Sequence, residues 1–179
     1  MVERRLNGDL AGSRALGEQA LAGYRKVLGE RHQYTQFAKV NLAATLRAQG
    51  ETDQAEAYDV EAGQLLESTL GAKHISTLTA AMSRANDHYA RLDFAQAEAA
   101  DAAVLPGLTE TAGADHPLTL ACTSNLALDK RGLGQSAEAD RLNSAAIAGL
   151  SRVLGEAHPW HTAARLHQRI ECDIAPLPM

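Results

Sequence analysis

A short Gly-x-x-His motif recurs four times along the chain, each time 42 residues after the previous copy. A fixed period of this size is typical of proteins built from stacked supersecondary units, because one such unit cannot bury its apolar face alone. The period therefore constrains the fold more than any other feature of the sequence. The four copies are Gly29 with His32, Gly71 with His74, Gly113 with His116, and Gly155 with His158.

A second turn position lies 21 residues before each of these glycines. Glycine occupies it at Gly8, Gly50 and Gly134, whereas Leu92 replaces glycine in the remaining copy. The segments between the turn positions are too long for ordinary strands, and their apolar residues are mainly Ala and Leu, which favour helix. We therefore expect about eight antiparallel helices, opening and closing with half repeats.

The four segments that follow the histidines are named the A helices, and the four that precede the glycines are named the B helices. The A helices are predicted at 34–49, 76–91, 118–133 and 160–173, and the B helices at 9–28, 53–70, 95–112 and 137–154. All eight would belong to a single array over residues 1–174. Pro176 cannot continue the last helix, so residues 175–179 are predicted to form an extended, Pro-containing tail.

The composition disfavours several classes of function. A net charge of -5 argues against a protein that binds the nucleic-acid backbone, which would normally carry a basic stripe. No run of eighteen apolar residues occurs, and the first residues lack the apolar stretch of a signal peptide. The two cysteines fit a reducing compartment. We therefore expect a cytoplasmic protein that contacts neither nucleic acid nor membrane.

Residues at several repeat positions resemble a known family. They are Asn41-Leu42-Ala43, Gly50, Leu70-Gly71 and His74, and again Asp115-His116-Pro117, Asn125-Leu126-Ala127 and Gly134. This pattern is similar to the tetratricopeptide (TPR) repeats of kinesin light chains and their bacterial relatives, which have the same 42-residue length. The end of the chain resembles the C-terminal arrays of actinobacterial TPR proteins. A HEAT-like solenoid has the same range of periods, but the Asn-Leu-Ala and Gly positions favour the TPR fold.

The resemblance implies an all-α fold, a right-handed α-α superhelix (TPR solenoid) whose A helices line a concave groove. It also implies a protein–protein interaction module that binds a peptide or protein segment in this groove. A side-chain amide both donates and accepts, so Asn41, Asn86 and Asn125 can bind the backbone of an extended peptide whatever its sequence. Alternatively, the asparagines bridge neighbouring A helices. The predicted groove residues are Phe37, Asn41, Arg47, Met82, Ser83, Asn86, Tyr89, Asn125, Arg131 and His167.

The charged residues of the A helices allow more than one interpretation. Arg47 and Arg131 can pair with a carboxylate of the bound peptide. Asp87 and Asp129 share one register, and they would form either an acidic series for a basic partner or internal ion pairs. The candidate partners in the second case are Arg84, Arg131 and Arg165.

The recurring histidines would lie on the order of 10 Å apart in stacked repeats, which is too far for them to share a metal ion. We therefore assign them to helix capping or loop packing, and we expect no metal site.

Sequence motifs of enzymes are lacking, since the chain has no Gly-rich phosphate loop, no H-E-x-x-H and no G-x-S-x-G. Cys122 shares a register with alanines, which indicates a small buried position. Cys172 is expected to be exposed and has no evident base. We predict that the chain is not an enzyme and requires no cofactor.

Two alternative functions are compatible with the sequence. Apolar residues of the first helix, among them Leu10, Leu16 and Tyr24, would have one neighbouring helix at most. This helix could therefore form a homodimer, as an assembly module of a larger regulatory system. The second alternative is a small-molecule-binding or catalytic helper that uses the superhelix interior near Trp160 and His167.

Overall fold

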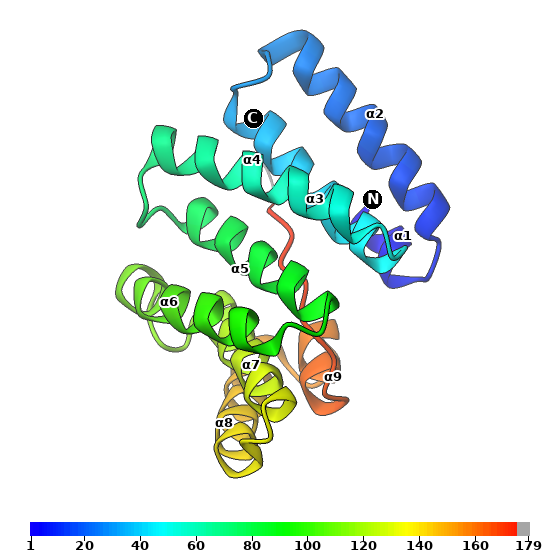
Figure 1. Ribbon diagram of the computed structural model, residues 1–179. Helices are drawn as coiled ribbons and strands as arrows, with labels where there is room; N and C mark the ends of the chain where they lie inside the picture. The colour runs from blue at the N-terminus through cyan, green and yellow to red at the C-terminus, as the bar shows by residue number, and fades with distance from the viewer. Residues whose placement is uncertain (175–179) are drawn as a thin grey trace. The chain divides into compact units, whose positions relative to one another are not determined.

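The computed structural model describes residues 1–174 of the 179-residue chain, and every regular element within that range is an α-helix (Figure 1). This confirms the predicted all-α class. None of the helices in the described part is long and apolar enough to cross a bilayer. The predicted tail at 175–179 lies outside the described residues. The helices are α1 (Val2–Leu6), α2 (Leu10–Leu28), α3 (Gln33–Ala48), α4 (Thr52–Leu70), α5 (Ile75–Ala90), α6 (Phe94–Ala112), α7 (Pro117–Gly132), α8 (Ser136–Leu154) and α9 (Pro159–Arg165).

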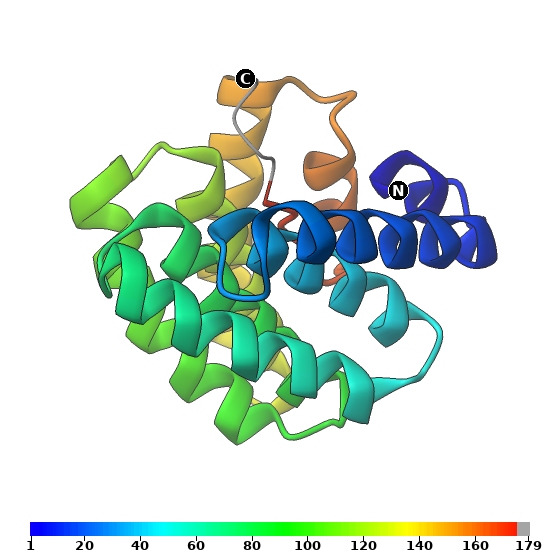
Figure 2. The ribbon, with the colours of Figure 1, turned by 90° about the horizontal axis from the view of Figure 1, so that it is seen from above.

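The helices form two compact units, which are described separately. Unit 1 comprises Met1–Ser83 together with the chain from Asp173, and unit 2 comprises Arg84–Cys172, so the division falls within α5. In unit 1, α1 packs on α2, α2 on α3 and α3 on α4. In unit 2, α6 packs on α7, α7 on α8 and α8 on α9. Figure 2 shows α2, in blue, lying alongside α3 within unit 1.

Small residues at equivalent repeat positions let successive helices pack closely. Each of the first three A helices places an alanine at one such position, and the B helices α4, α6 and α8 place alanines at another. Because alanine is short, the helix backbones approach one another, and a leucine of each of these B helices fills the remaining space. The alanines are Ala43, Ala85, Ala127, Ala55, Ala97 and Ala139, and the leucines are Leu66, Leu108 and Leu150, all 0% or 1% exposed.

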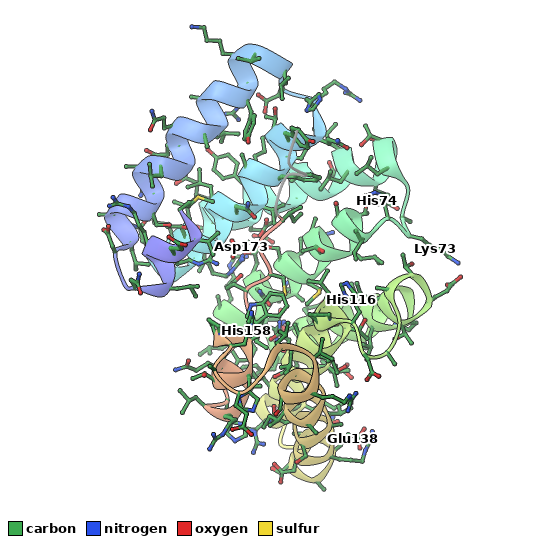
Figure 3. All side chains as sticks on the ribbon, turned by 180° about the vertical axis from the view of Figure 1, so that it is seen from behind. Lys73, His74, His116, Glu138, His158 and Asp173 are labelled. Atoms are coloured by element: carbon green, nitrogen blue, oxygen red, sulfur yellow. The ribbon has the colours of Figure 1, made fainter. Side chains whose placement is uncertain are left out.

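Each A helix follows one of the recurring histidines, whose Nδ1 accepts a hydrogen bond from the backbone N–H two residues later. The four N–H groups belong to Tyr34, Ser76, Leu118 and Trp160, at nitrogen–nitrogen distances of 3.1 to 3.2 Å. Each imidazole thereby satisfies one N–H group that a helix leaves free in its first turn. This confirms the capping role predicted for the histidines, three of which are labelled in Figure 3. Among the described residues, no group of three or more His, Cys, Asp or Glu side chains could hold a metal ion.

The turn after an A helix requires a residue in the left-handed region of backbone conformation. Gly50 and Gly134 adopt φ values of 84° and 78° there, and Leu92 adopts 62° at the equivalent position. A residue with a Cβ is strained in this region by roughly 1–2 kcal/mol, whereas glycine is not. The Leu92 side chain is 71% exposed, so its packing offsets little of this strain.

The last A helix is shorter than predicted. The sequence predicts helix over 160–173, but α9 ends at Arg165, and His167 adopts a left-handed φ of 53°. The N–H groups of His167 and Gln168 bond back to the carbonyl oxygens of Ala164 and Ala163, which closes the helix end. The physical reason is tertiary: residues 169–174 make ion pairs and hydrogen bonds with distant residues, and these contacts outweigh a weak local preference for helix.

A short helix that the sequence did not predict, α1, precedes the first B helix. The Ser13 hydroxyl of α2 donates to the Met1 carbonyl oxygen at 3.0 Å. It also forms a hydrogen bond with the Thr45 hydroxyl of α3 at 2.9 Å. The first B helix, α2, therefore packs against two helices, α1 and α3, rather than one at most.

We expect Leu92→Gly to raise the free energy of unfolding by about 0.5–1 kcal/mol, because the relief of strain exceeds the extra entropy that glycine gives the unfolded chain. Urea denaturation followed by circular dichroism measures the change. The matched control is Leu133→Gly, since Leu133 also follows an A helix and is exposed but has a φ of -85°. A loss of stability in both variants would contradict the assignment of strain to Leu92.

Candidate functional site

The last described residues, 168–174, have no regular secondary structure, and we call them the C-terminal segment (red end of the colour bar in Figure 1). The side chains of Ile170, Cys172 and Ile174 are buried, whereas the residues between them are only partly buried. This period of two is that of an extended chain with one face covered. Cys172 is 7% exposed, so the expectation of an exposed thiol is wrong, because the extended segment turns this side chain toward the protein.

In unit 2, two asparagines of the A helices bind the backbone of the C-terminal segment. The Asn125 amide donates to the carbonyl oxygen of Ile170 at 2.9 Å and accepts from the Ile170 N–H at 2.8 Å. Asn86 donates to the same carbonyl oxygen at 3.3 Å and to the Glu171 carboxylate at 2.9 Å. Both polar groups of the Ile170 backbone are therefore satisfied by side chains, although the residue is 1% exposed.

In unit 1, Asn41 makes the same pair of bonds with a different residue. Its amide donates to the Ile174 carbonyl oxygen at 2.9 Å and accepts from the Ile174 N–H at 2.8 Å. The Ile174 side chain packs in an apolar cluster with Phe37. The Asp173 carboxylate, labelled in Figure 3, pairs with Arg5 of α1 at 2.6 Å.

Arg169 of the C-terminal segment makes several polar contacts within unit 2. Its guanidinium forms ion pairs with Asp101 of α6 and Asp129 of α7, both of which are 0% exposed. It also donates to Asn86 Oδ1 at 2.6 Å and to the Asn125 carbonyl oxygen at 3.1 Å. The Tyr89 ring lies against the cation, with 4.8 Å between the guanidinium carbon and the ring centroid.

Burial perturbs the titration of the groups around this guanidinium. Burial raises the pKa of Asp101 to about 8, opposed by Arg169 and reinforced by the neighbouring Asp129 carboxylate. The same desolvation raises the pKa of Asp129. One guanidinium balances one of the two carboxylates, so the pair retains a proton more readily than an isolated aspartate does. Burial also raises the pKa of the Cys122 thiol, which keeps it protonated.

The remaining predicted groove residues contact other parts of the protein. Arg47 pairs with buried Asp59 at 3.1 Å and donates to Ser83 at 3.0 Å, all within unit 1. Met82 is 1% exposed. Arg131 pairs with Asp140 at 2.6 Å. The Nδ1 atom of His167 lies 3.3 Å from the amide nitrogen of Asn143.

Sequence reasoning missed Arg169 and Asp101. Asp129 does form an internal ion pair, but its partner is none of the three arginines considered from the sequence. A signal for Asp101 was present, because Asp59 and Asp101 stand one 42-residue period apart within otherwise apolar faces of B helices. A polar residue repeated at a buried position requires a partner.

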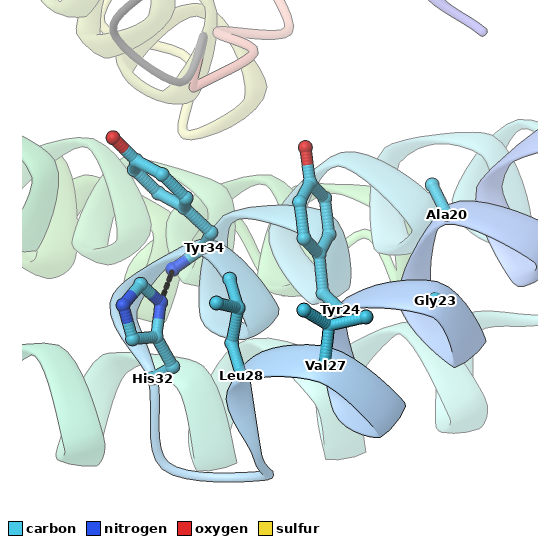
Figure 4. A pocket seen from close by; sticks show the side chains of 7 residues that line it. All are labelled: Ala20, Gly23, Tyr24, Val27, Leu28, His32 and Tyr34. Carbon is cyan, nitrogen blue, oxygen red and sulfur yellow. Dashed lines mark hydrogen bonds between the residues drawn. The ribbon is translucent and has the colours of Figure 1, made fainter. Parts of the chain in front are cut away.

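An apolar pocket of about 470 Å³ opens between α2 and α3 in unit 1 (Figure 4). The rings of Tyr24 and Tyr34 flank it, with centroids 6.1 Å apart, and Val27 lies at its edge with 78% of its surface exposed. The residues that line it are Ala20, Gly23, Tyr24, Val27, Leu28, His32 and Tyr34.

The raised pKa of Asp101 predicts how stability depends on pH. Between about pH 4 and pH 8 the folded chain holds a proton on this carboxyl that the unfolded chain has lost, so this contribution to stability falls as the pH rises. Urea denaturation at pH 5, 6.5 and 8 measures the slope, and Asp101→Asn is expected to flatten it because the amide cannot ionise. Equal slopes for the two proteins would contradict the assignment.

Comparison with known proteins identifies the family of the chain. A family model described as Tetratricopeptide repeat matches residues 5–34, 38–76 and 119–159. Two solved structures from Podosopora anserina, described as kinesin light chain with nearly identical TPR-like repeats, are similar to the chain, and one of them carries a substitution. Each is 24% identical with a TM-score of 0.69, and the match covers 92% of this chain and 78% of that chain. No curated protein matches the chain.

An identity of this size shows only that the fold is shared with the kinesin light chain-like repeats. The family model is more informative, because the three matched ranges together cover more than half of the chain. The helix pairs recur with the same 42-residue period over the matched ranges and beyond them. The chain therefore belongs to the tetratricopeptide repeat family and has the all-α solenoid fold of that family.

Proposed function

We propose that the chain is a protein–protein interaction module whose A helices bind an extended polypeptide segment through asparagine side chains. Tetratricopeptide repeats generally mediate protein–protein interaction, and scaffolds of this kind are typically non-enzymatic. The proposal adds to this general role a specific mode of binding, by the backbone of the partner.

The paired hydrogen bonds between Asn125 and Ile170 are the observation that carries the proposal. An amide that bonds both the N–H and the C=O of one residue recognises the backbone, so it accepts an extended segment whatever side chain that residue bears. Asn41 makes the same pair with Ile174 within unit 1, two repeat periods earlier in the chain. The recurrence of the contact at an equivalent repeat position supports a property of the A helices rather than of one bound sequence.

The chain's own C-terminal segment occupies these contacts in the structure. A covalently attached segment competes at an effective concentration on the order of millimolar. A partner in trans must therefore displace it, and we expect weak binding to the intact chain and tighter binding once the segment is released.

Ile170→Asp provides a release variant, because it places a carboxylate at a position that is 1% exposed. Faster reaction of the Cys172 thiol with Ellman's reagent would report the release. We expect a fluorescein-labelled peptide of residues 167–174, with serine in place of the cysteine, to bind this variant at least about tenfold more tightly than it binds the wild-type chain. Fluorescence anisotropy measures both affinities.

Asn125→Ala in the Ile170→Asp background tests the role of the asparagine. Loss of two hydrogen bonds worth about 1 kcal/mol each predicts an affinity lower by about tenfold or more. Asn7→Ala is the matched control, since Asn7 is an exposed residue of unit 1 that follows α1, whereas Asn125 is buried in α7 of unit 2. If Asn125→Ala and Asn7→Ala bind the peptide equally, the asparagines do not hold the ligand.

The apolar pocket between α2 and α3 favours a second candidate function, self-association of two copies of the chain. Exposed Val27 and the ring of Tyr24 present an apolar surface of the kind that marks protein contacts. A contact of this surface with its own copy would be isologous and closed, which gives a dimer rather than a filament.

If this surface forms a dimer, Val27→Glu will shift the chain to a monomer in multi-angle light scattering, because the dimer would have to bury the new carboxylate. Lys26→Glu is the control, since it makes a larger change in charge at an adjacent exposed position that does not line the pocket. A wild-type chain that is monomeric at several hundred micromolar rules out this candidate.

A further inference from the structure

Two buried carboxylates of unit 2, on α6 and α7, lie close together and pair with an arginine that does not come from either helix. Asp101 and Asp129 are each 0% exposed, and their ion-pair partner is Arg169 of the C-terminal segment. Taking two carboxylates out of water is costly unless cations and hydrogen bonds compensate. The helices of unit 2 therefore form a pocket whose stability depends on a cation supplied from outside the helix pairs.

The equivalent position one period earlier shows that this arrangement is specific to unit 2. In unit 1, Asp59 on α4 is neutralised by Arg47 of the adjacent helix α3, at 3.1 Å. One period after Arg47 the chain has Tyr89, so Asp101 has no corresponding arginine on α5. Because Tyr89 occupies the position equivalent to Arg47, this repeat has no internal cation there. The aromatic ring instead offers a flat surface against which another guanidinium can lie.

The geometry of the pocket suits arginine better than lysine. The nitrogens of the Arg169 guanidinium bond to groups on three helices. These groups are Asn86 Oδ1 on α5, the Asp101 carboxylate on α6, and the Asn125 carbonyl oxygen and Asp129 carboxylate on α7. The guanidinium carbon also lies over the Tyr89 ring, 4.8 Å from its centroid. A lysine ammonium is a single point charge, so it cannot bond to all of these groups at once or stack in the same way.

The two carboxyls also interact with each other, through a hydrogen bond between Asp101 and Asp129. The arginine cation and a proton retained by the pair together balance the two negative charges. The pocket therefore requires a single cation, which Arg169 supplies.

We propose that the pocket of Asp101, Asp129, Asn86 and Tyr89 is a specificity subsite that takes an arginine, followed by an apolar residue, from an extended peptide of a protein partner. The inference rests on the proposed function, because Asn125 would hold the backbone of the apolar residue as it holds Ile170. The chain's own Arg169 and Ile170 occupy the subsite as an intramolecular competitor.

Peptide variants test the subsite on the full-length Ile170→Asp chain. The probes are the labelled peptide of residues 167–174 described above and two copies in which the arginine is replaced by lysine or alanine. We expect the alanine peptide to bind at least about thirtyfold more weakly, because it leaves the buried carboxylates without a cation, and the lysine peptide to bind about tenfold more weakly. Adding Asp101→Asn and Asp129→Asn together should make the three affinities equal within about threefold.

The outcomes separate this inference from the proposed function. Equal binding of the arginine and alanine peptides, with both weakened by Asn125→Ala, overturns the arginine subsite and leaves the backbone contact standing. Binding of none of the peptides overturns both. A preference for arginine that Asn125→Ala does not weaken supports the subsite and contradicts the backbone contact.

A chain with the wild-type C-terminal segment offers a second measurement that does not depend on the release variant. Cys172 is buried next to the subsite in the C-terminal segment, whereas Cys122 is 0% exposed within α7. Because Cys122 contacts Asp101, it is replaced by alanine, the residue at the equivalent positions 38, 80 and 164. In this Cys122→Ala background, an excess of the unlabelled arginine peptide should raise the rate of Cys172 modification by at least about threefold, by displacing the segment. The same excess of the alanine peptide should leave the rate unchanged. Equal rates with both peptides would overturn the subsite.

Discussion

The hydrogen bonds between the Asn125 amide and the backbone of Ile170 are the contact on which the candidate site depends. Ile170 is 1% exposed, and a buried N–H or C=O without a partner costs about 1–3 kcal/mol. A single asparagine removes this cost for both groups, which allows an extended chain to lie against a helix that has no free backbone groups of its own. Once Ile170 is held, the preceding Arg169 lies within reach of Asp101 and Asp129.

These contacts also decide where the last helix ends. Residues 166–174 contain neither glycine nor proline, so nothing local prevents α9 from continuing. A helix over these residues would carry Arg169 and Ile170 on a path that cannot also satisfy Asn125 and the two buried aspartates. The chain instead turns at His167, which accepts a left-handed φ of 53°, and becomes the extended occupant of its own A helices. An extended segment, residues 168–174, thus replaces the second part of the last predicted A helix.

The sequence predicts the helices well because each repeat carries its own turn residues and its own histidine cap. It also indicates Asn41, Asn86 and Asn125 as residues able to hold an extended chain, because an amide both donates and accepts. The alternative role, a bridge between neighbouring A helices, is present as well, since the Asn125 amide donates to Asn86 Oδ1 at 3.4 Å. It does not predict the occupant, because the partners of Arg169 lie 40 to 83 residues away in the sequence. Arg47 and buried Asp59 are only 12 residues apart in the sequence, but their pairing was missed because the repeated buried aspartate on the B helices was not considered.

Amide hydrogen exchange at Ile170 tests the central contact most directly, because the N–H of this residue has the Asn125 side chain as its acceptor. In the wild-type chain we expect strong protection of this amide, and in Asn125→Ala we expect exchange at Ile170 to accelerate by at least about tenfold while the amides in the middle of α7 keep their protection. An Ile170 amide that exchanges as fast as an unfolded peptide in the wild-type chain, or equally slowly in both proteins, would contradict the account.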